Sequence, residues 1–403
     1  MPDSRTHSHI TEHALKLIPF DTGDCSALIS DYCNYPDHYH SDPDSVLPYH
    51  FETDGVQFHY LPDPPYNHLY RYWGVKEGKI CRMKPFRNEH FIHAKAGFQW
   101  YLEHAVSCVQ NNEMEEGKKF LGCLLHVLED STFGVHALEG DGGTDIFLMN
   151  RLFDSPVLPL SFLTKISCLD CTAPEYQPVS LGNTAAEAVM NLYASYCKKA
   201  DSSRKCAFQV IRDGIDGKST DAPVKKMFDN AVQLCADVIY TVYQISKGIS
   251  GEETNLPLTE LVPFESPCGG FRNYNLRTTE LNRAFLPDGT EIPLELQTEN
   301  GICSVENGLS FGSHFEGALR YWIAPETFRE FTCRIGLHPA CTGNGEIVFE
   351  IFNNGENVSE FVLDQENRAK ELCVKAPGNE FSIQFHSTSS CGIVVVANPL
   401  LKR

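Results

Sequence analysis

The sequence lacks a long apolar run, an excess of basic residues and the start of a secretory signal. No segment approaches the roughly 18 consecutive apolar residues that a membrane-spanning helix needs, so we expect no integral membrane segment. Lysine and arginine number 33 against 53 aspartates and glutamates among 403 residues, which gives a formal net charge of −20. Because such a surface repels a phosphate backbone, we do not expect broad nucleic-acid binding through a basic face.

The first residues contain no basic segment followed by an apolar stretch. We therefore expect a cytoplasmic protein, or a secreted one if a leader has been removed from the chain. The 16 cysteines are scattered, without the density or the spacing of a small disulfide scaffold. This distribution indicates reduced thiols.

Residues 1–250 are predicted to form a mainly α-helical domain. Over Phe120–Leu128 the apolar residues recur with the spacing of a buried helix face, at Phe120, Cys123, Leu124, Val127 and Leu128. The segments Glu89–Val109 and Val224–Ile245 show comparable helical patterns. Two long stretches rich in proline and tyrosine, Tyr32–Tyr72 and Phe153–Val179, predict irregular loops of functional character.

The remainder of the chain predicts β-structure. Residues 251–299 are expected to hold a linker and the start of a β region, and residues 300–403 a β-sandwich. The runs Glu346–Phe352 and Gly392–Val396 have strand character, and Asn353–Gly355 and Pro287–Gly289 predict turns. The predicted fold class is thus a multidomain α + β protein, with a helical N-terminal domain followed by a C-terminal β-sandwich.

Histidine is concentrated in the first third of the chain. Thirteen of the 16 histidines lie from His7 to His136. Neutral imidazoles are the commonest protein ligands of metals, so the crowding suits a metal site, although scattered surface histidines would give the same composition.

A histidine and an aspartate four residues apart mark one predicted helix. His126 and Asp130 project from the same side of that helix, roughly 40° apart, because each residue turns the helix by about 100°. An imidazole and a carboxylate placed in this way can hold one divalent ion or bridge two. Gly122, one turn earlier, would leave room beside them.

This segment resembles the signature LGxxxHxxxDxxxxxH of the zinc-dependent phospholipase C family of bacilli and clostridia, which includes the clostridial alpha-toxins, and of the related fungal zinc nucleases. The signature is complete here as Leu121, Gly122, His126, Asp130 and His136. Asn150 and Asp154 occupy the register of the family's downstream HxxxE or HxxxD pair, with Asn in place of His. The likeness covers roughly residues 6–245.

Two shorter segments extend the resemblance. Thr6–Ile10 looks like the opening helix of the family, which makes His7 a ligand. Asp37, in Tyr-Pro-Asp, and the later His59 are similar to the family's loop aspartate and the histidine that follows it. Asp31 is the alternative to Asp37.

The resemblance implies a helical catalytic domain that holds up to three zinc ions. By the family's pattern, the ligands of one ion are Asp37, His59, His126 and Asp130. Those of a second ion are His136, Asn150 and Asp154, and a third ion takes His7 and a bridging Asp130. The family completes this third site with an N-terminal tryptophan, whereas this chain begins with Met1 and Pro2, so removal of the methionine would supply the amine of Pro2 instead.

The activity implied by the resemblance is hydrolysis of phospholipid-type phosphodiesters. In such sites metal ions lower the pKa of a water and neutralise charge on the phosphoryl oxygens, and Asp37 would act as general base. Two alternatives stay open. One is a single-strand nuclease or 3′-nucleotidase-like enzyme on the same site. The other is a non-catalytic binding protein with a degraded zinc site, which Asn150 favours because an amide oxygen is a poorer zinc ligand than imidazole.

The C-terminal part carries a second resemblance. The segments Gly308–Tyr321, Phe328–Leu337 and Gly345–Gly355 resemble the NPCBM-type carbohydrate-binding module, over about residues 300–400. This resemblance implies a carbohydrate partner. The ending Val396–Pro399 departs from the Asp-Trp that usually precedes the proline in that family.

Overall fold

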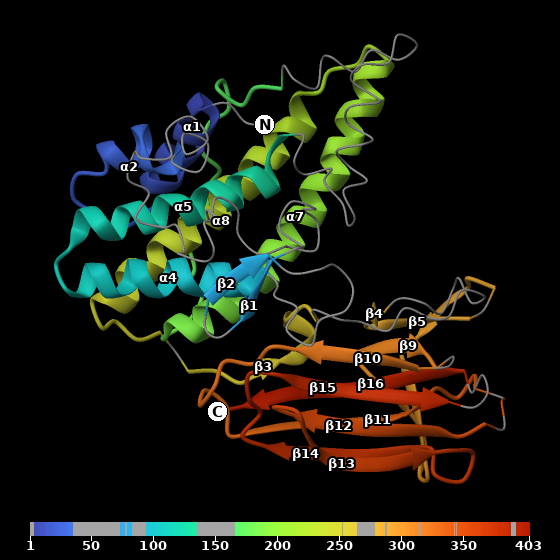
Figure 1. Ribbon diagram of the computed structural model, residues 1–403. Helices are drawn as coiled ribbons and strands as arrows, with labels where there is room; N and C mark the ends of the chain where they lie inside the picture. The colour runs from blue at the N-terminus through green and yellow to red at the C-terminus, as the bar shows by residue number, and fades with distance from the viewer. Residues whose placement is uncertain are drawn as a thin grey trace. The chain divides into compact units, whose positions relative to one another are not determined.

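A computed structural model describes residues 4–34, 73–76, 79–82, 94–134, 166–251, 253–263, 279–286, 288–313, 316–341, 343, 345–387 and 392–403. The chain divides into two compact units, Met1–Gly251 and Glu252–Arg403. The first is mainly helical and the second is a β-sandwich, so the predicted fold class is confirmed (Figure 1).

Four long helices form the body of the described part of the first unit. In chain order its elements are α1 (Ser4–Lys16), α2 (Ser26–Ser30), the 3₁₀ turn η1 (Tyr32–Asn34), β1 (Trp73–Lys76), β2 (Lys79–Arg82), α4 (Ala94–Gln110), α5 (Met114–Thr132), α7 (Ala185–Ile215) and α8 (Asp221–Ser246). Helix α8 contacts α1, α4, α5 and α7, which makes it the shared packing partner of the unit. Figure 1 shows α4 and α5 side by side, and these two helices are in contact.

The predicted helical segments are confirmed over their described residues, and residues 89–93 at the start of one of them lie outside the described residues. The pattern over Val224–Ile245 corresponds to α8, whose Phe228, Ala231 and Cys235 are fully buried. Helix α7 begins after Thr184, whose hydroxyl accepts a hydrogen bond from the backbone N–H of Glu187 at 3.2 Å. The carboxylate of Glu187 reaches back to the N–H of Asn183, the residue before the N-cap, at 2.9 Å, one residue earlier than in a standard capping box.

The described residues of the second unit form two antiparallel sheets and additional hairpins. Its strands are β3 (Leu256–Pro257), β4 (Glu280–Leu281), β5 (Arg283–Phe285), β6 (Glu291–Pro293), β7 (Glu295–Thr298), β8 (Gly301–Ser304), β9 (Gly308–Gly312), β10 (Glu316–Tyr321), β11 (Glu330–Leu337), β12 (Ile347–Asn353), β13 (Glu356–Leu363), β14 (Ala369–Lys375), β15 (Phe381–Ser387) and β16 (Ile393–Lys402). One sheet has the order β10-β15-β12-β13, and the other has the order β14-β11-β16-β9-β4 with β3 added on β16.

Aromatic rings fill the space between the two sheets. The rings of Phe311 and Phe385 stack with centroids 5.1 Å apart, and those of Phe331 and Phe381 lie 4.8 Å apart. In each pair one ring comes from the larger sheet and its partner comes from β15 of the smaller sheet. Both inner faces therefore contribute to one apolar core, which is what a β-sandwich requires.

The turn predicted at Asn353–Gly355 joins β12 to β13. Asn354 has a φ of 51° and Gly355 a φ of 81°, and positive values at both central residues define the type I′ turn that suits a tight hairpin. Pro287, in the other predicted turn, lies outside the described residues. Strands already occur within residues 251–299, since β3 pairs with β16 through Leu256 and Leu401.

None of the described helices combines the length and the apolar character needed to cross a membrane.

A buried carboxylate ties the segment before α7 to helix α8. Asp237 is 2% exposed, and both of its carboxylate oxygens accept hydrogen bonds from the hydroxyl of Tyr176, at 2.9 Å. The backbone N–H of Val179 donates to the same carboxylate, also at 2.9 Å. Burial raises the pKa of Asp237 to about 6, although the hydrogen bonds from Val179 and Tyr176 oppose that rise.

This raised pKa predicts a specific pH dependence of stability. In the unfolded chain an aspartate titrates near 3.9, so between about pH 4 and pH 6 the folded state binds more protons than the unfolded state. The stabilising contribution of protonated Asp237 to the free energy of unfolding is fully present below about pH 4. It is lost as the pH rises to about 6, and the loss amounts to about 2–3 kcal/mol. Asp237→Asn should remove this loss, which urea denaturation followed by the helical circular dichroism signal at several pH values would measure.

Tyr176→Phe provides a second variant for the same experiment. It removes a hydrogen bond to the ionised carboxylate but keeps the burial, so the loss of stability should extend above pH 6. If Asp237→Asn keeps the full wild-type pH dependence over this range, Asp237 is not the group responsible.

Candidate metal centre

Helix α5 is buried on every side along its second half. Every residue from Phe120 to Thr132 is buried, including the polar His126, Glu129 and Asp130. The predicted apolar face of this helix is confirmed. The polar residues beside that face are as inaccessible as the apolar ones, so each needs a partner inside the protein. Ser131 and Thr132 donate to carbonyls of the preceding turn of α5, whereas His126 and Glu129 also contact other elements.

The turn η1 supplies the partner of His126. The Nδ1 atom of His126 lies 2.8 Å from the backbone carbonyl oxygen of Cys33 in η1. A carbonyl can only accept a hydrogen bond, so Nδ1 carries a proton, and in the neutral imidazole that metal binding requires the lone pair is then on Nε2. This hydrogen bond from Nδ1 fixes the His126 ring in the orientation that a metal-binding imidazole needs.

Gly122 allows η1 to approach α5 this closely. A Cβ atom at Gly122 would lie 2.5 Å from the carbonyl carbon of Tyr32 and 2.6 Å from its oxygen. The space that the sequence predicted beside His126 is therefore occupied by the backbone of the residue before Cys33. No side chain larger than that of glycine fits there without moving η1.

Helix α1 brings in His7, which is fully buried. Its Nδ1 lies 2.7 Å from Glu129 Oε2, and its ring stacks on that of His126 with centroids 4.2 Å apart. The Nε2 atom of His7 is 3.6 Å from Asp130 Oδ1, and the Nε2 atom of His126 is 3.4 Å from Asp130 Oδ2. The two imidazoles thus face opposite oxygens of one carboxylate.

Glu129 is the carboxylate that orients His7. It is fully buried, and the Thr11 hydroxyl donates a hydrogen bond to its Oε1 at 2.6 Å. Burial raises the pKa of Glu129, while the hydrogen bonds from His7 and Thr11 favour the charged form. With this carboxylate ionised, Nδ1 of His7 is the donor and Nε2 is left with its lone pair.

The donor set at this point fits a divalent metal ion. His7, His126 and Asp130 each offer one ligand atom, and these atoms all lie within 4.8 Å of one another. Two imidazole nitrogens and a carboxylate oxygen are ligands that zinc prefers. Each imidazole also donates from its other nitrogen to an oxygen, the arrangement usual around metal-binding histidines. The three groups could hold one ion together, or Asp130 could bridge two.

The remaining predicted ligands belong to segments that the structure does not describe. Asp37, His59, His136, Asn150 and Asp154 lie outside the described residues, so their placement at the site stays a prediction. Asp31, the alternative to Asp37, is exposed at the end of α2. Within the part of the chain that the structure describes, it belongs to no group of ligand-type side chains close enough to hold an ion.

Sequence reasoning missed the residues that orient the ligands. Glu129 directly follows Val127 and Leu128 on the predicted buried helix, and a charged residue next to that apolar stretch was a usable signal. Thr11 is one turn after His7 on α1, so the face of that helix shared by both also pointed to it. The carbonyl of Cys33 could not have been found, because a backbone acceptor has no sequence signature.

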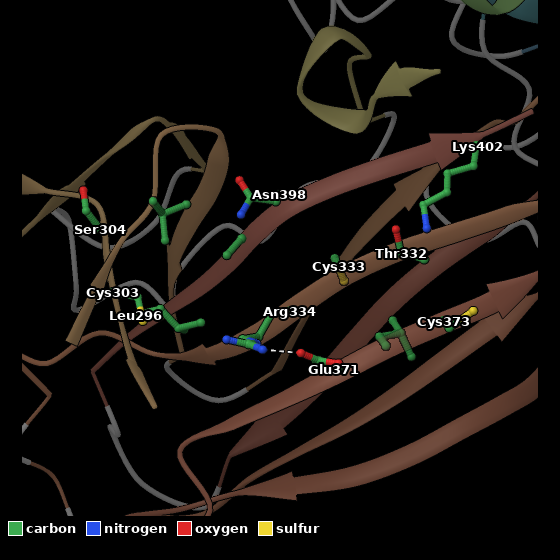
Figure 2. A pocket seen from close by; sticks show the side chains of 13 residues that line it. Leu296, Cys303, Ser304, Thr332, Cys333, Arg334, Glu371, Cys373, Asn398 and Lys402 are labelled. Carbon is green, nitrogen blue, oxygen red and sulfur yellow. Dashed lines mark hydrogen bonds and ion pairs between the residues drawn. The ribbon is translucent and has the colours of Figure 1, made fainter. Parts of the chain in front are cut away.

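The β-sandwich contains a separate cavity of about 550 Å³. Figure 2 shows it between Leu296 and Cys303 of the β7–β8 hairpin and side chains of β11, β14 and β16. Arg334 and Glu371 form an ion pair there. None of the described residues that line it is aromatic, so it offers no ring on which a sugar could stack.

Comparison with known proteins gives structural likenesses only. No protein-family model matches the sequence, and no curated protein matches it either. The alpha-toxin of Clostridium absonum is similar at 12% identity, over 99% of this chain and 94% of that chain, with a TM-score of 0.35. The alpha-toxin of an avian Clostridium perfringens strain is similar at 11% identity, over 97% of this chain and 84% of that chain, with a TM-score of 0.30.

A third likeness concerns carbohydrate-binding modules. The tandem CBM51 modules of a family 98 glycoside hydrolase from Streptococcus pneumoniae are similar over 38% of this chain at 13% identity, with a TM-score of 0.34. The chain spans 48% of the length of that protein. TM-scores this low carry no functional argument for either unit.

Gly122→Ala should test how η1 supports the site. The added methyl group must displace the Tyr32 backbone, which we expect to cost about 1–3 kcal/mol of stability, as for overpacking elsewhere. The hydrogen bond from His126 to Cys33 should lengthen, and zinc affinity should fall at least about tenfold. Gly117→Ala on the same helix is the control. A methyl group added at Gly117 would first meet the side chain of Val109, at 3.0 Å, and not the backbone of η1. Equal zinc affinities in the two variants would contradict this account.

Glu129→Gln should separate metal binding from folding. Loss of the charge removes the group that holds His7 with its lone pair toward Asp130, so zinc affinity should fall about 10- to 100-fold. Stability of the metal-free protein should change by less than about 1 kcal/mol or increase, because a buried charge is costly to desolvate. Glu116→Gln, at the half-buried ion pair with Lys119 on the same helix, should change neither the zinc affinity nor the stability. Zinc titration and urea denaturation measure the two quantities.

Proposed function

We propose that the helical unit is a zinc-dependent phosphoric diester hydrolase of the phospholipase C kind. The observation that carries the proposal is the convergence of His7, His126 and Asp130 in a buried cluster, with both imidazoles oriented by hydrogen bonds from their other nitrogens. The resemblance of the segment from Leu121 to His136 to the family signature supports the same reaction class. The substrate class, phospholipid-type phosphodiesters, rests on that resemblance alone.

The chain's own residues have distinct tasks in this proposal. His7 and His126 donate electron pairs, and Asp130 contributes negative charge between them. Zinc, when bound, supplies a Lewis acid that lowers the pKa of water and neutralises phosphoryl charge. Glu129 and the carbonyl of Cys33 hold the two imidazoles in the required tautomer. The burial of α5 keeps bulk water away from these contacts, which strengthens each of them. Asp37 remains the proposed general base.

Two other functions use the same cluster. A single-strand nuclease would need the same metal centre, and the net charge of −20 argues only mildly against it. A non-catalytic binding protein would need no more than the fold, and Asn150 in the proposed second set of ligands favours it. The orientation of both imidazoles favours a working metal site over a degraded one, because a site that no longer binds metal does not require these contacts.

For the β-sandwich we propose carbohydrate binding, based on the resemblance of its strands to the NPCBM module. The cavity lined by Arg334 and Glu371 has no stacking ring among its described residues, so we do not assign the sugar to it.

Side-by-side assays test the hydrolase. We expect zinc-loaded protein to cleave phosphatidylcholine and a chromogenic phosphocholine ester, and to leave single-stranded DNA intact. His126→Ala should lower activity at least about 100-fold, because it removes an electron-pair donor from the cluster. His104→Ala, a histidine on α4 outside the cluster, should keep full activity. Cleavage of DNA alone would replace the phospholipase by the nuclease. Failure of zinc-loaded protein on all three substrates would favour the binding protein.

A further inference from the structure

Helix α1 carries a second group of metal-binding side chains besides His7. His9, Glu12 and His13 each offer one ligand atom, and these atoms lie within 4.8 Å of one another. All three residues are half-buried, whereas the cluster around His7 is buried. His7 and His9 are two residues apart and so point about 200° apart around the helix. The second group is therefore separate from the cluster on α5.

Hydrogen bonds orient both imidazoles of this group. His9 donates from Nε2 to the carbonyl oxygen of Cys171 at 3.1 Å, and His13 donates from Nδ1 to the carbonyl oxygen of His9 at 2.8 Å. Carbonyls only accept, so the lone pairs are on Nδ1 of His9 and Nε2 of His13. The two rings lie with their centroids 4.2 Å apart. As in the first cluster, each ring keeps one nitrogen for a ligand and uses the other for support.

Phe228 packs against the two rings, whereas the carboxylate of Glu12 is about half exposed. The ring of Phe228 on α8 lies 5.4 Å from that of His9 and 5.5 Å from that of His13. Glu12 pairs with Lys16 at 2.8 Å, and both side chains are about half exposed. An exposed ion pair of this kind contributes little stability, so Glu12 can turn from Lys16 to a cation at small cost.

We propose that His9, Glu12 and His13 form a second binding site for a divalent transition-metal ion of the zinc class. Two imidazoles four residues apart on a helix are the spacing that zinc sites use. Two nitrogens and one oxygen suit zinc better than magnesium or calcium, which prefer oxygen ligands alone. Because the group is half exposed, water completes the coordination. Since His9 also contacts Cys171, an ion here would fix α1 to the segment that precedes α7.

Zinc counting on the full chain tests the site. Metal-free wild type, His13→Gln, His126→Ala and the double variant would be dialysed against zinc, and bound zinc measured by mass spectrometry. His13→Gln should bind one zinc fewer than wild type. His126→Ala should keep this ion, and the double variant should lose it. His104→Gln, which removes a histidine elsewhere in the same unit, should bind as much zinc as wild type. An unchanged zinc count in His13→Gln would overturn the proposal.

Lys16→Gln gives an independent test that requires no loss of a ligand. The ammonium group of Lys16 competes with a cation for Glu12, so its removal should tighten zinc binding at this site about threefold to fivefold, as expected for an exposed charge a few ångströms away. Lys205→Gln, which removes a similar exposed pair with Asp201 on α7, should leave the affinity unchanged. If the zinc affinity of this site stays the same or falls in Lys16→Gln, the proposal that Glu12 is a ligand is contradicted. The result does not depend on hydrolase activity, so the two proposals fail separately.

Discussion

The complete burial of helix α5 is the constraint on which the candidate centre depends. An exposed helix can leave polar side chains to water, but from Phe120 to Thr132 this helix has no exposed residue. The costs of burying Glu129, His126 and Asp130 must be offset by partners brought from elsewhere. Helix α1 contributes His7 and Thr11, and η1 contributes a backbone carbonyl. The polar cluster thus depends on two elements, α1 and η1, that both pack against this part of α5.

Helix α1 has a different role on each of its sides. One side places His7 and Thr11 against Glu129 in a fully buried setting, where hydrogen bonds are strong and a charge loses its hydration. The other side places His9 and His13 beside Phe228 and partly in contact with solvent, where charges keep part of their hydration. The same helix therefore supports a rigid, preorganised group and an adaptable one. Two residues of separation along the chain are enough to keep them apart.

The β-sandwich is held together by contacts of another kind. Its two sheets share an apolar core of phenylalanine rings, and its charged pairs are on the outside, such as Glu330 with Lys375 and Lys402. These two lysines lower the pKa of Glu330 to about 2 at the surface. Charges that remain hydrated need no network, which explains why this unit has nothing comparable to the cluster on α5 in its described core.

Local sequence patterns determined the elements and part of the site. The apolar spacing around Phe120 predicted α5, the Asn-Gly pair after β12 predicted its hairpin, and the four-residue spacing placed His126 and Asp130 on one side of a helix. Each of these depends on neighbours a few residues away, which the sequence displays directly. Resemblance to a family added His7, which no local pattern would have joined to α5. The remaining proposed ligands, from Asp37 to Asp154, stay predictions from the same resemblance.

Only the tertiary structure decided how the ligands are oriented. His7 and Glu129 are 122 residues apart, and His126 and Cys33 are 93 residues apart. Whether an imidazole presents a lone pair or a proton depends on what contacts its other nitrogen, and here those contacts come from distant segments. The glycine at 122 was visible in the sequence, but its purpose was not, because the group that fills its space is the backbone of Tyr32. Periodicity reports which side of a helix a residue occupies, whereas the long-range packing of α1 and η1 on α5 determines what that residue can bind.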